Sequence, residues 1–303
     1  VNFISNRPKA IAIFQALFVT FLWSTSWVLI KEGLKDLPPL TFAGLRYLLA
    51  FLILIPVYLR QSKKVELKRL TKNDWGLLIT LGIVYYTLTQ GLQFLGLKYL
   101  PAITFSLLLN FTALFTAVLA LIFLKEKLSN WQWVGILVFL AGVFVYFYPL
   151  NLPVGLALGL AIGMATVFSN SIASIIGRFI NRSKHLDPLT VTVVSMGIGA
   201  ILLFTIGLLT EEWQPLSLTN WGNIFVLAAI NTAFAFTLWN HTLRTISATE
   251  SSLINNTMLI QIAILAWLFL GEQPSIKEWL GMAIVGIGVI MVTLQRKRIS
   301  EGE

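Results

Sequence analysis

The chain has 303 residues, of which 57% are hydrophobic and 12% are charged, and its formal net charge is +9. Soluble domains carry about 25% charged residues, so this composition excludes an ordinary soluble protein and indicates an integral membrane protein. The chain contains no cysteine, which excludes disulfides, thiolate chemistry and cysteine-ligated metals. In a membrane protein a basic excess usually reflects cytoplasmic loops, so we expect no nucleic-acid partner.

Apolar segments of the length needed to cross a bilayer recur along the whole chain. A span needs roughly 20 mostly apolar residues, and ten segments qualify: 10–30, 41–59, 75–97, 102–124, 131–148, 152–177, 188–210, 221–243, 248–270 and 278–295. The connections between them are short, and several contain proline, which costs least outside a helix. The sequence therefore predicts an all-α membrane protein of ten transmembrane helices.

The distribution of lysine and arginine predicts the orientation, because cytoplasmic loops are enriched in these residues. Of the 22 Lys and Arg residues, seventeen fall on the side of the N-terminus, four fall on the opposite side and Arg46 lies within a span. We therefore expect a multi-pass protein of the cell inner (plasma) membrane with both termini in the cytoplasm.

An internal repeat divides the chain into two halves. With a shift of 146 residues, 75–143 aligns on 221–289 without a gap. The matches of rarer residues include Trp75/Trp221, Ser106/Ser252, Asn110/Asn256, Glu126/Glu272, Gly135/Gly281 and Gly142/Gly288. Because five spans are an odd number, the second copy is expected to be inverted. We predict two inverted five-helix repeats, 1–149 and 150–303, around a central cavity, an arrangement typical of secondary transporters with a midplane substrate site.

Several short motifs occur in a consistent order along the chain. They are the stretch Phe21-Leu22-Trp23-Ser24-Thr25-Ser26-Trp27-Val28, Pro39 with Arg46-Tyr47, Gly96-Leu97-Lys98-Tyr99, Lys125-Glu126-Lys127, Trp133-Val134-Gly135 with Gly142, and then Gly271-Glu272 and Trp279-Leu280-Gly281. Together they resemble an EamA-type permease of the drug/metabolite transporter (DMT) superfamily. The resemblance implies an export permease of ten helices with a central cavity and with spans 5 and 10 at the periphery. Many members have a proline about three residues after the positions of Asn110 and Asn256, and this chain has none there.

Uncharged polar and aromatic side chains concentrate in spans 1, 3, 4, 6, 8 and 9 and are almost absent from spans 5 and 10. Polar side chains inside a bilayer seek a partner helix or a wet cavity, so this division separates cavity-lining helices from scaffold. The candidate substrate-binding residues, with the one intramembrane cation, are Trp23, Ser26, Arg46, Tyr85, Tyr86, Gln90, Asn110, Asn170, Asn231, Trp239 and Asn256.

Some of these candidates have plainer interpretations. Arg46 is either an anion site for a carboxylate or phosphate, or a structural lock, or a side chain that reaches back to the interface. For Asn110 and Asn256 we favour interhelical hydrogen bonds over substrate contact. Trp23 and Trp239, with Tyr85, are suited to enclose an organic solute.

The acidic residues all fall in loops, tails or helix ends, whereas proton-driven carriers generally keep an ionisable group inside the membrane. For Glu250 we favour a role at the start of span 9, and for His241 interface packing over proton carriage. Glu126 and Glu272 follow spans 4 and 9, and we expect them to tie down the starts of spans 5 and 10. These assignments predict a neutral or zwitterionic solute that moves down its own gradient.

No nucleophile with a base, no paired carboxylates and no metal-ligand cluster is visible, so we predict no enzyme, no catalytic residue, no metal and no cofactor. The predicted function is secondary transport, as exporter or facilitator, of small organic metabolites such as amino acids or related amphipathic solutes. A lipid or hydrophobic-compound translocase and proton-coupled drug efflux are the alternatives. The expected partners are the substrate and the lipid bilayer. The sequence leaves the substrate, the direction and the oligomeric state open, and a monomer is plausible.

Overall fold

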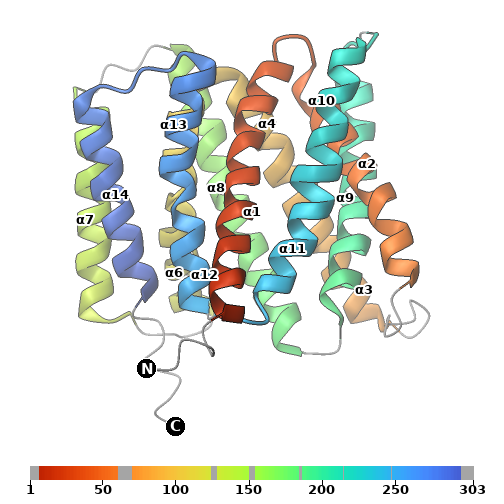
Figure 1. The fold of residues 1–303 in the computed structure, drawn as a ribbon, viewed down its shortest axis with the longest axis horizontal. Coiled ribbons are helices and arrows are strands. Elements are labelled where there is room, and N and C mark those ends of the chain that lie inside the picture. The colour runs from red at the N-terminus through yellow and green to blue at the C-terminus, as the bar shows by residue number, and fades with distance from the viewer. Residues whose placement is uncertain are drawn as a thin grey trace. The chain divides into compact units, whose positions relative to one another are not determined.

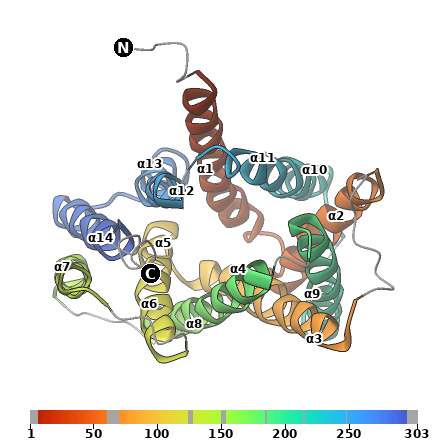
Figure 2. The same ribbon diagram turned by 90° about the horizontal axis from the view of Figure 1, so that it is seen from below.

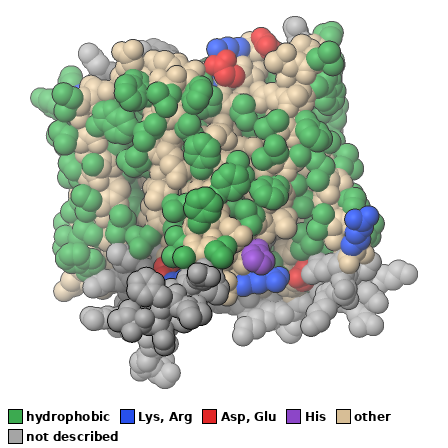
Figure 3. Space-filling model, in the orientation of Figure 1, with side chains coloured by type: hydrophobic (Ala, Val, Ile, Leu, Met, Phe, Trp, Pro, Cys, Tyr) green, Lys and Arg blue, Asp and Glu red, His purple; other side chains and the backbone are tan. Residues whose placement is uncertain are grey.

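The computed structural model describes residues 7–60, 70–123, 128–149, 154–183, 186–213, 215–246 and 248–294. The regular secondary structure of these residues is helical throughout (Figure 1). Within them, ten helical stretches are long and apolar enough to cross a membrane, which confirms the predicted number of spans. On the face drawn in Figure 3, hydrophobic side chains cover the middle of the helices and charged side chains gather near their ends.

Six spans are single helices and four are assembled from shorter pieces. The single helices are α1 (Arg7–Gly33), α2 (Pro39–Arg60), α7 (Asn130–Phe147), α8 (Val154–Ser183), α9 (Pro188–Thr210) and α14 (Ile276–Leu294). Span 3 consists of α3 (Lys72–Leu81), the π-helical η2 (Gly82–Thr89) and α4 (Gln90–Tyr99), and span 4 of α5 (Ala102–Leu109) and α6 (Phe111–Phe123). Span 8 consists of α10 (Leu218–Ala228), the π-helical η3 (Ala229–Phe234) and α11 (Ala235–Thr242), and span 9 of α12 (Ala248–Asn256) and α13 (Met258–Leu270).

Two glutamates cap the starts of helices distant in sequence. The Glu211 carboxylate accepts hydrogen bonds from the backbone N–H groups of Leu40 (2.9 Å) and Thr41 (2.8 Å), at the start of α2. The Glu272 carboxylate accepts from Ala102 N (2.6 Å) and Ile103 N (2.9 Å), at the start of α5.

The expectation that Glu272 ties down the start of span 10 is therefore wrong. Pro101 precedes α5 and provides no side-chain cap, so the first N–H groups of α5 need an acceptor from elsewhere. The start of α14 has its own capping contacts, because Ser275 and Glu278 bind each other's backbone N–H groups. Glu126 lies outside the described residues.

The chain groups into two compact units. One, which we call the α7/α14 unit, comprises Val1–Val28, Pro101–Val154 and Phe234–Glu303; the other, the α2/α9 unit, comprises Leu29–Leu100 and Gly155–Ala233. Each unit draws spans from both halves of the sequence, so the compact units do not coincide with the two predicted repeats.

In the α7/α14 unit, α7 and α14 lie side by side (Figures 1 and 2). A Cβ added to Gly142 would lie 2.6 Å from Val285 N, and one added to Gly288 would lie 2.5 Å from Phe139 N. The two backbones therefore touch, and because higher numbers on α7 face lower numbers on α14, the helices run antiparallel. Glycine permits this approach, which is a common way for membrane helices to associate.

The α2/α9 unit is built around a similar pair. A Cβ added to Gly44 of α2 would lie 2.5 Å from Phe204 Cα, and one added to Gly207 of α9 would lie 2.6 Å from Thr41 N. The two helices are thus also antiparallel. They are spans 2 and 7, as α7 and α14 are spans 5 and 10, so each pair joins two spans that stand five apart in the chain.

The glycine contact predicts a difference between two alanine substitutions in α14. Gly288→Ala should destabilise the protein by about 1–3 kcal/mol, because its Cβ collides with the backbone of α7. Gly286→Ala should cause no loss, because nothing lies within 4 Å of its Cβ position. Thermal unfolding of the purified variants in detergent measures both. Equal midpoints for the two variants would contradict the close contact.

Candidate substrate-binding residues

Spans 3 and 8 both contain a π-helical segment. The eight residues of η2 and the six of η3 occupy corresponding positions under the 146-residue shift. π-Helical turns are rare and frequently mark functional sites. In each segment a threonine hydroxyl donates to the carbonyl oxygen five residues earlier: Thr89 to Val84 O (2.8 Å), and Thr232 to Leu227 O (2.8 Å). The widened turns are therefore stabilised from within their own spans.

Spans 4 and 9 each contain one tightened helical turn, and the positions of the two turns agree to within one residue under the 146-residue shift. Asn110 N donates to Leu107 O (3.1 Å) and Thr257 N to Ile254 O (3.1 Å), three residues back instead of four. These two spans are thus irregular although no proline lies within five residues of either turn.

The tightened turns explain the roles of the two repeat-related asparagines. Because Asn110 N turns toward Leu107 O, the carbonyl of Ser106 loses its usual donor, and Asn110 Nδ2 replaces it at 2.8 Å. In span 9 the Thr257 hydroxyl bonds Ile254 O (2.6 Å), and the buried Asn256 Nδ2 has no hydrogen-bond partner among the described residues. The expected interhelical hydrogen bonds are therefore wrong for both residues.

In the α2/α9 unit, Arg46 is buried, with 5% of its surface exposed. Its Nε donates to Thr232 Oγ1 (3.1 Å) in η3. The guanidinium carbon lies 5.2 Å from the ring centroid of Tyr47 and 6.0 Å from that of Phe94. Residues from α2, α4 and η3 thus converge on one cation.

An aromatic group continues from this cation into span 3. The Tyr47 hydroxyl donates a hydrogen bond to Gln90 Oε1 (2.6 Å). The Tyr47 ring packs edge-on against the Tyr86 ring, with centroids 5.7 Å apart, and the Tyr86 ring packs edge-on against that of Tyr85, with centroids 4.9 Å apart. The structure thus connects Arg46, Tyr85, Tyr86 and Gln90 of the predicted set through Tyr47. Asn231, buried in η3, is adjacent in sequence to Thr232, and Asn170 is half-buried on α8.

Sequence reasoning did not select Tyr47 and Thr232. The position of Tyr47 next to Arg46 offered one signal, whereas a threonine in an apolar helix usually bonds its own backbone and offered none.

The remaining candidates belong to the α7/α14 unit. The rings of Trp23 and Trp239 lie 5.2 Å apart and those of Trp23 and Phe236 5.4 Å apart. The buried Nε1 of Trp23 has no hydrogen-bond partner in the described part of the chain. Ser26 is buried, and its hydroxyl donates to Leu22 O (3.4 Å) in its own helix.

Glu250 and His241 are the two groups weighed for a role in proton coupling. Glu250 forms an ion pair with Lys9 (2.6 Å), and both side chains are partly exposed. Ser247, which would complete the capping box with Glu250, lies outside the described residues. His241 is exposed near the end of α11.

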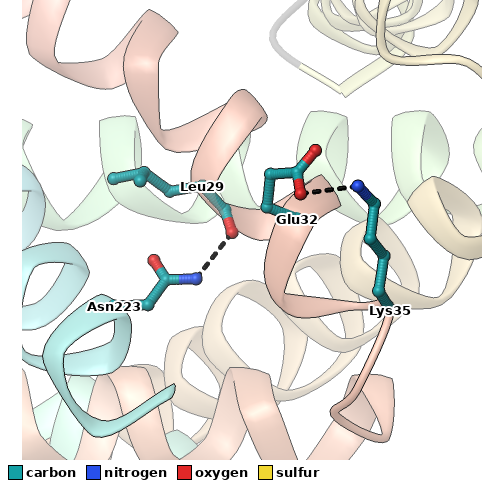
Figure 4. A network of polar contacts seen from close by, with 4 residues as sticks. All are labelled: Leu29, Glu32, Lys35 and Asn223. Atoms are coloured by element: carbon teal, nitrogen blue, oxygen red, sulfur yellow. Dashed lines mark hydrogen bonds and ion pairs between the residues drawn. The ribbon is translucent and has the colours of Figure 1, made fainter. Parts of the chain in front are cut away.

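A second polar group in the α2/α9 unit lies at the end that carries the α1–α2 connection (Figure 4). Asn223 Nδ2 donates to Leu29 O (2.9 Å), and Lys35 pairs with Glu32 (2.6 Å). Lys31 donates to the carbonyls of Leu97 and Leu100, both at 2.6 Å. The contacts of Asn223 and Lys31 go to backbone oxygens and join helix ends, so we assign them to structure.

Ten apolar helices with buried polar groups and irregular backbone define a multi-pass membrane protein with the features of a transporter. Comparison with known families identifies the transporter family. The model of the EamA-like transporter family matches the chain twice, over residues 10–148 and 157–294. The chain belongs to this family, and thereby to the transporters of the DMT superfamily.

Individual relatives cover nearly the whole chain. The uncharacterized transporter YoaV of Bacillus subtilis is 25% identical over 92% of this chain and 96% of its own length. An S-adenosylmethionine/S-adenosylhomocysteine transporter of Chlamydia trachomatis serovar L2 is 24% identical over 92% of this chain and 88% of its own. A solved crystal structure, 19% identical, matches with a TM-score of 0.68 over 96% of this chain and 99% of that one, which supports the fold.

The asparagine geometry predicts unequal effects of the same substitution at repeat-related positions. Asn110→Leu should lower stability by about 1 kcal/mol, because it leaves the Ser106 carbonyl without a donor. Asn256→Leu should leave stability unchanged or raise it, since it removes a buried donor that has no partner among the described residues. Unfolding midpoints of the two purified variants test this. A larger loss for Asn256→Leu would contradict the assignment.

Proposed function

We propose that the protein is an exporter or facilitator of small organic metabolites, such as amino acids or related amphipathic solutes. The observation that carries this proposal is the irregular backbone of spans 3, 4, 8 and 9 at repeat-related places. Interrupted helices at corresponding positions of two halves are the usual sign of a transporter's binding site. Spans 3, 4 and 8 also carry buried polar side chains, among them Gln90, Ser106 and Asn231, whereas spans 5 and 10 are continuous helices in close contact.

The proposed substrate contacts come from Trp23, Ser26, Arg46, Tyr85, Tyr86, Gln90, Asn110, Asn170, Asn231, Trp239 and Asn256. The division into two inverted repeats, 1–149 and 150–303, is part of this proposal, and the antiparallel pairing of α2 with α9 and of α7 with α14 supports it. The substrates after which the chlamydial relative is named are small organic metabolites, which also supports the substrate class.

We further propose that the protein lies in the inner membrane with both termini in the cytoplasm. The asymmetry of lysine and arginine along the sequence supports this orientation. Tag-accessibility mapping tests it, and termini on opposite sides would contradict it.

The proposed site predicts which side-chain truncations affect transport. Gln90→Ala and Trp239→Ala should reduce transport by about tenfold, equivalent to about 1.4 kcal/mol of lost interaction, with little loss of folded protein. Val138→Ala and Ile287→Ala, in α7 and α14, should leave transport nearly intact.

The measurement starts from cells that overproduce the protein, screened for resistance to amino acids, their analogues and toxic metabolites. The variants are then compared on the compound that gives the strongest resistance, with membrane levels of the protein as the control. Equal losses in the two groups would contradict the division into binding and scaffold helices. Resistance restricted to lipophilic compounds would favour the translocase alternative.

Energy coupling is the subject of a second functional prediction. Coupling to protons needs a group that binds a proton within the site, and one charge moved across 100 mV is worth about 2.3 kcal/mol. The carboxylates of Glu211 and Glu272 are held by backbone N–H groups, and Glu250 is paired with Lys9. We therefore expect facilitated transport down the substrate gradient.

Reconstituted vesicles with equal substrate on both sides and an imposed pH gradient should show no accumulation. Accumulation that Glu250→Gln or His241→Ala abolishes would contradict this prediction and identify the coupling group.

A further inference from the structure

Arg46 is a buried cation without an acidic partner in the described part of the chain. The ion pairs of the described residues are Lys9 with Glu250 and Lys35 with Glu32, and neither involves Arg46. Burial of a charge is costly unless the charge is paired and hydrogen-bonded. Because Arg46 is 5% exposed as a residue, its charge favours a counter-charge from outside the chain.

The hydrogen bonds of Arg46 leave most of its donors open. Thr232 Oγ1 accepts from Nε (3.1 Å), while the Thr232 hydroxyl proton goes to Leu227 O (2.8 Å). The threonine thus fixes one edge of the guanidinium. None of the described residues accepts a hydrogen bond from Nη1 or Nη2. These two groups are the fork that binds carboxylates in a bidentate manner.

The direction of the side chain argues against an interfacial position. The Cβ site of Gly33 lies 2.5 Å from the Phe42 ring and 2.9 Å from Asn223 Nδ2, so these two residues mark one level at the loop end of the unit. At about 1.5 Å per residue, Arg46 begins roughly 6 Å below that level and Thr232 lies roughly 13 Å below it. Because Arg46 Nε is hydrogen-bonded to this deeper residue, we infer that the guanidinium lies within the span and not at the interface.

We propose that Arg46 binds the carboxylate of a small organic substrate, a monoanion or a zwitterion. This proposal rests on the transport function proposed above and specifies its substrate class. One guanidinium balances one carboxylate, whereas a phosphate monoester carries about −1.5 to −2 at neutral pH and would leave buried negative charge. Of the two lysines that precede Arg46 in the same unit, Lys35 is paired with Glu32, and Lys31 is bound to the carbonyls of Leu97 and Leu100.

The test measures thermal unfolding of the purified full-length protein in nanodiscs, titrated with acetate, acetamide or inorganic phosphate at constant ionic strength set by chloride. Acetate should raise the midpoint in a saturable way, and acetamide and phosphate should not. In Arg46→Gln the apparent dissociation constant for acetate should rise by at least about tenfold. Arg60→Gln, at the exposed end of the same helix, should respond as the unaltered protein does.

The midpoint without ligand separates a binding role from a structural lock. Arg46→Gln removes an uncompensated buried charge, so its midpoint should be equal or higher, whereas loss of a lock would lower it. If Arg46→Gln does not fold, the responses of the unaltered protein to acetate, acetamide and phosphate still test the proposal. Equal responses to acetate and phosphate, or no response to acetate, overturn the proposal.

Transport is assayed separately, so the two proposals can fail independently. Transport that persists in Arg46→Gln, without any acetate response of the unaltered protein, overturns the carboxylate site and leaves the transport function. A selective acetate response lost in Arg46→Gln supports the site even where no tested compound is transported.

Discussion

The constraint on which this structure depends is that a bilayer core contains no water, so each backbone N–H and C=O needs a partner within the protein. At three helix ends the partners are charged side chains distant in sequence. Glu211 and Glu272 accept from the first N–H groups of α2 and α5, and Lys31 donates to the last carbonyls of α4. Inside the spans, the partners are a threonine hydroxyl in η2 and η3 and the Asn110 amide in span 4.

The same constraint limits where irregular backbone can occur. Non-helical backbone at membrane depth is tolerated where protein or a wet cavity covers it, and not against lipid. Spans 3, 4, 8 and 9 carry the widened and tightened turns. Polar side chains of the same spans bond the backbone there, and apolar side chains such as Leu88, Ile230 and Phe234 occupy the exposed positions of the π-helical segments. Spans 5 and 10 need no such protection, and their glycines bring α7 and α14 into backbone contact. The helices α7 and α14 are thus regular and closely packed, whereas the irregular turns occur in spans 3, 4, 8 and 9.

How much the sequence predicts follows from the physics of each feature. The ten spans were predictable because length and apolarity alone decide them. The π-helical segments were not predictable, because they have no residue signature comparable to proline. Glu272 was assigned to the wrong helix because a cap from a distant element depends on tertiary packing. Thr232 was missed because its role depends on the position of Arg46.

The cations of the α2/α9 unit show why hydrogen-bond completeness is a better guide to a binding site than burial. Lys31 and Arg46 both lie among helices, but Lys31 donates to two carbonyls that a helix end leaves without partners, and a helix C-terminus attracts positive charge. Arg46 faces no helix end and uses one donor, on a threonine. Neutral buried donors such as Asn256 Nδ2 also have no partner among the described residues. The open fork of Arg46 differs from them because it carries a charge, and a ligand carboxylate would supply both the hydrogen bonds and the counter-charge.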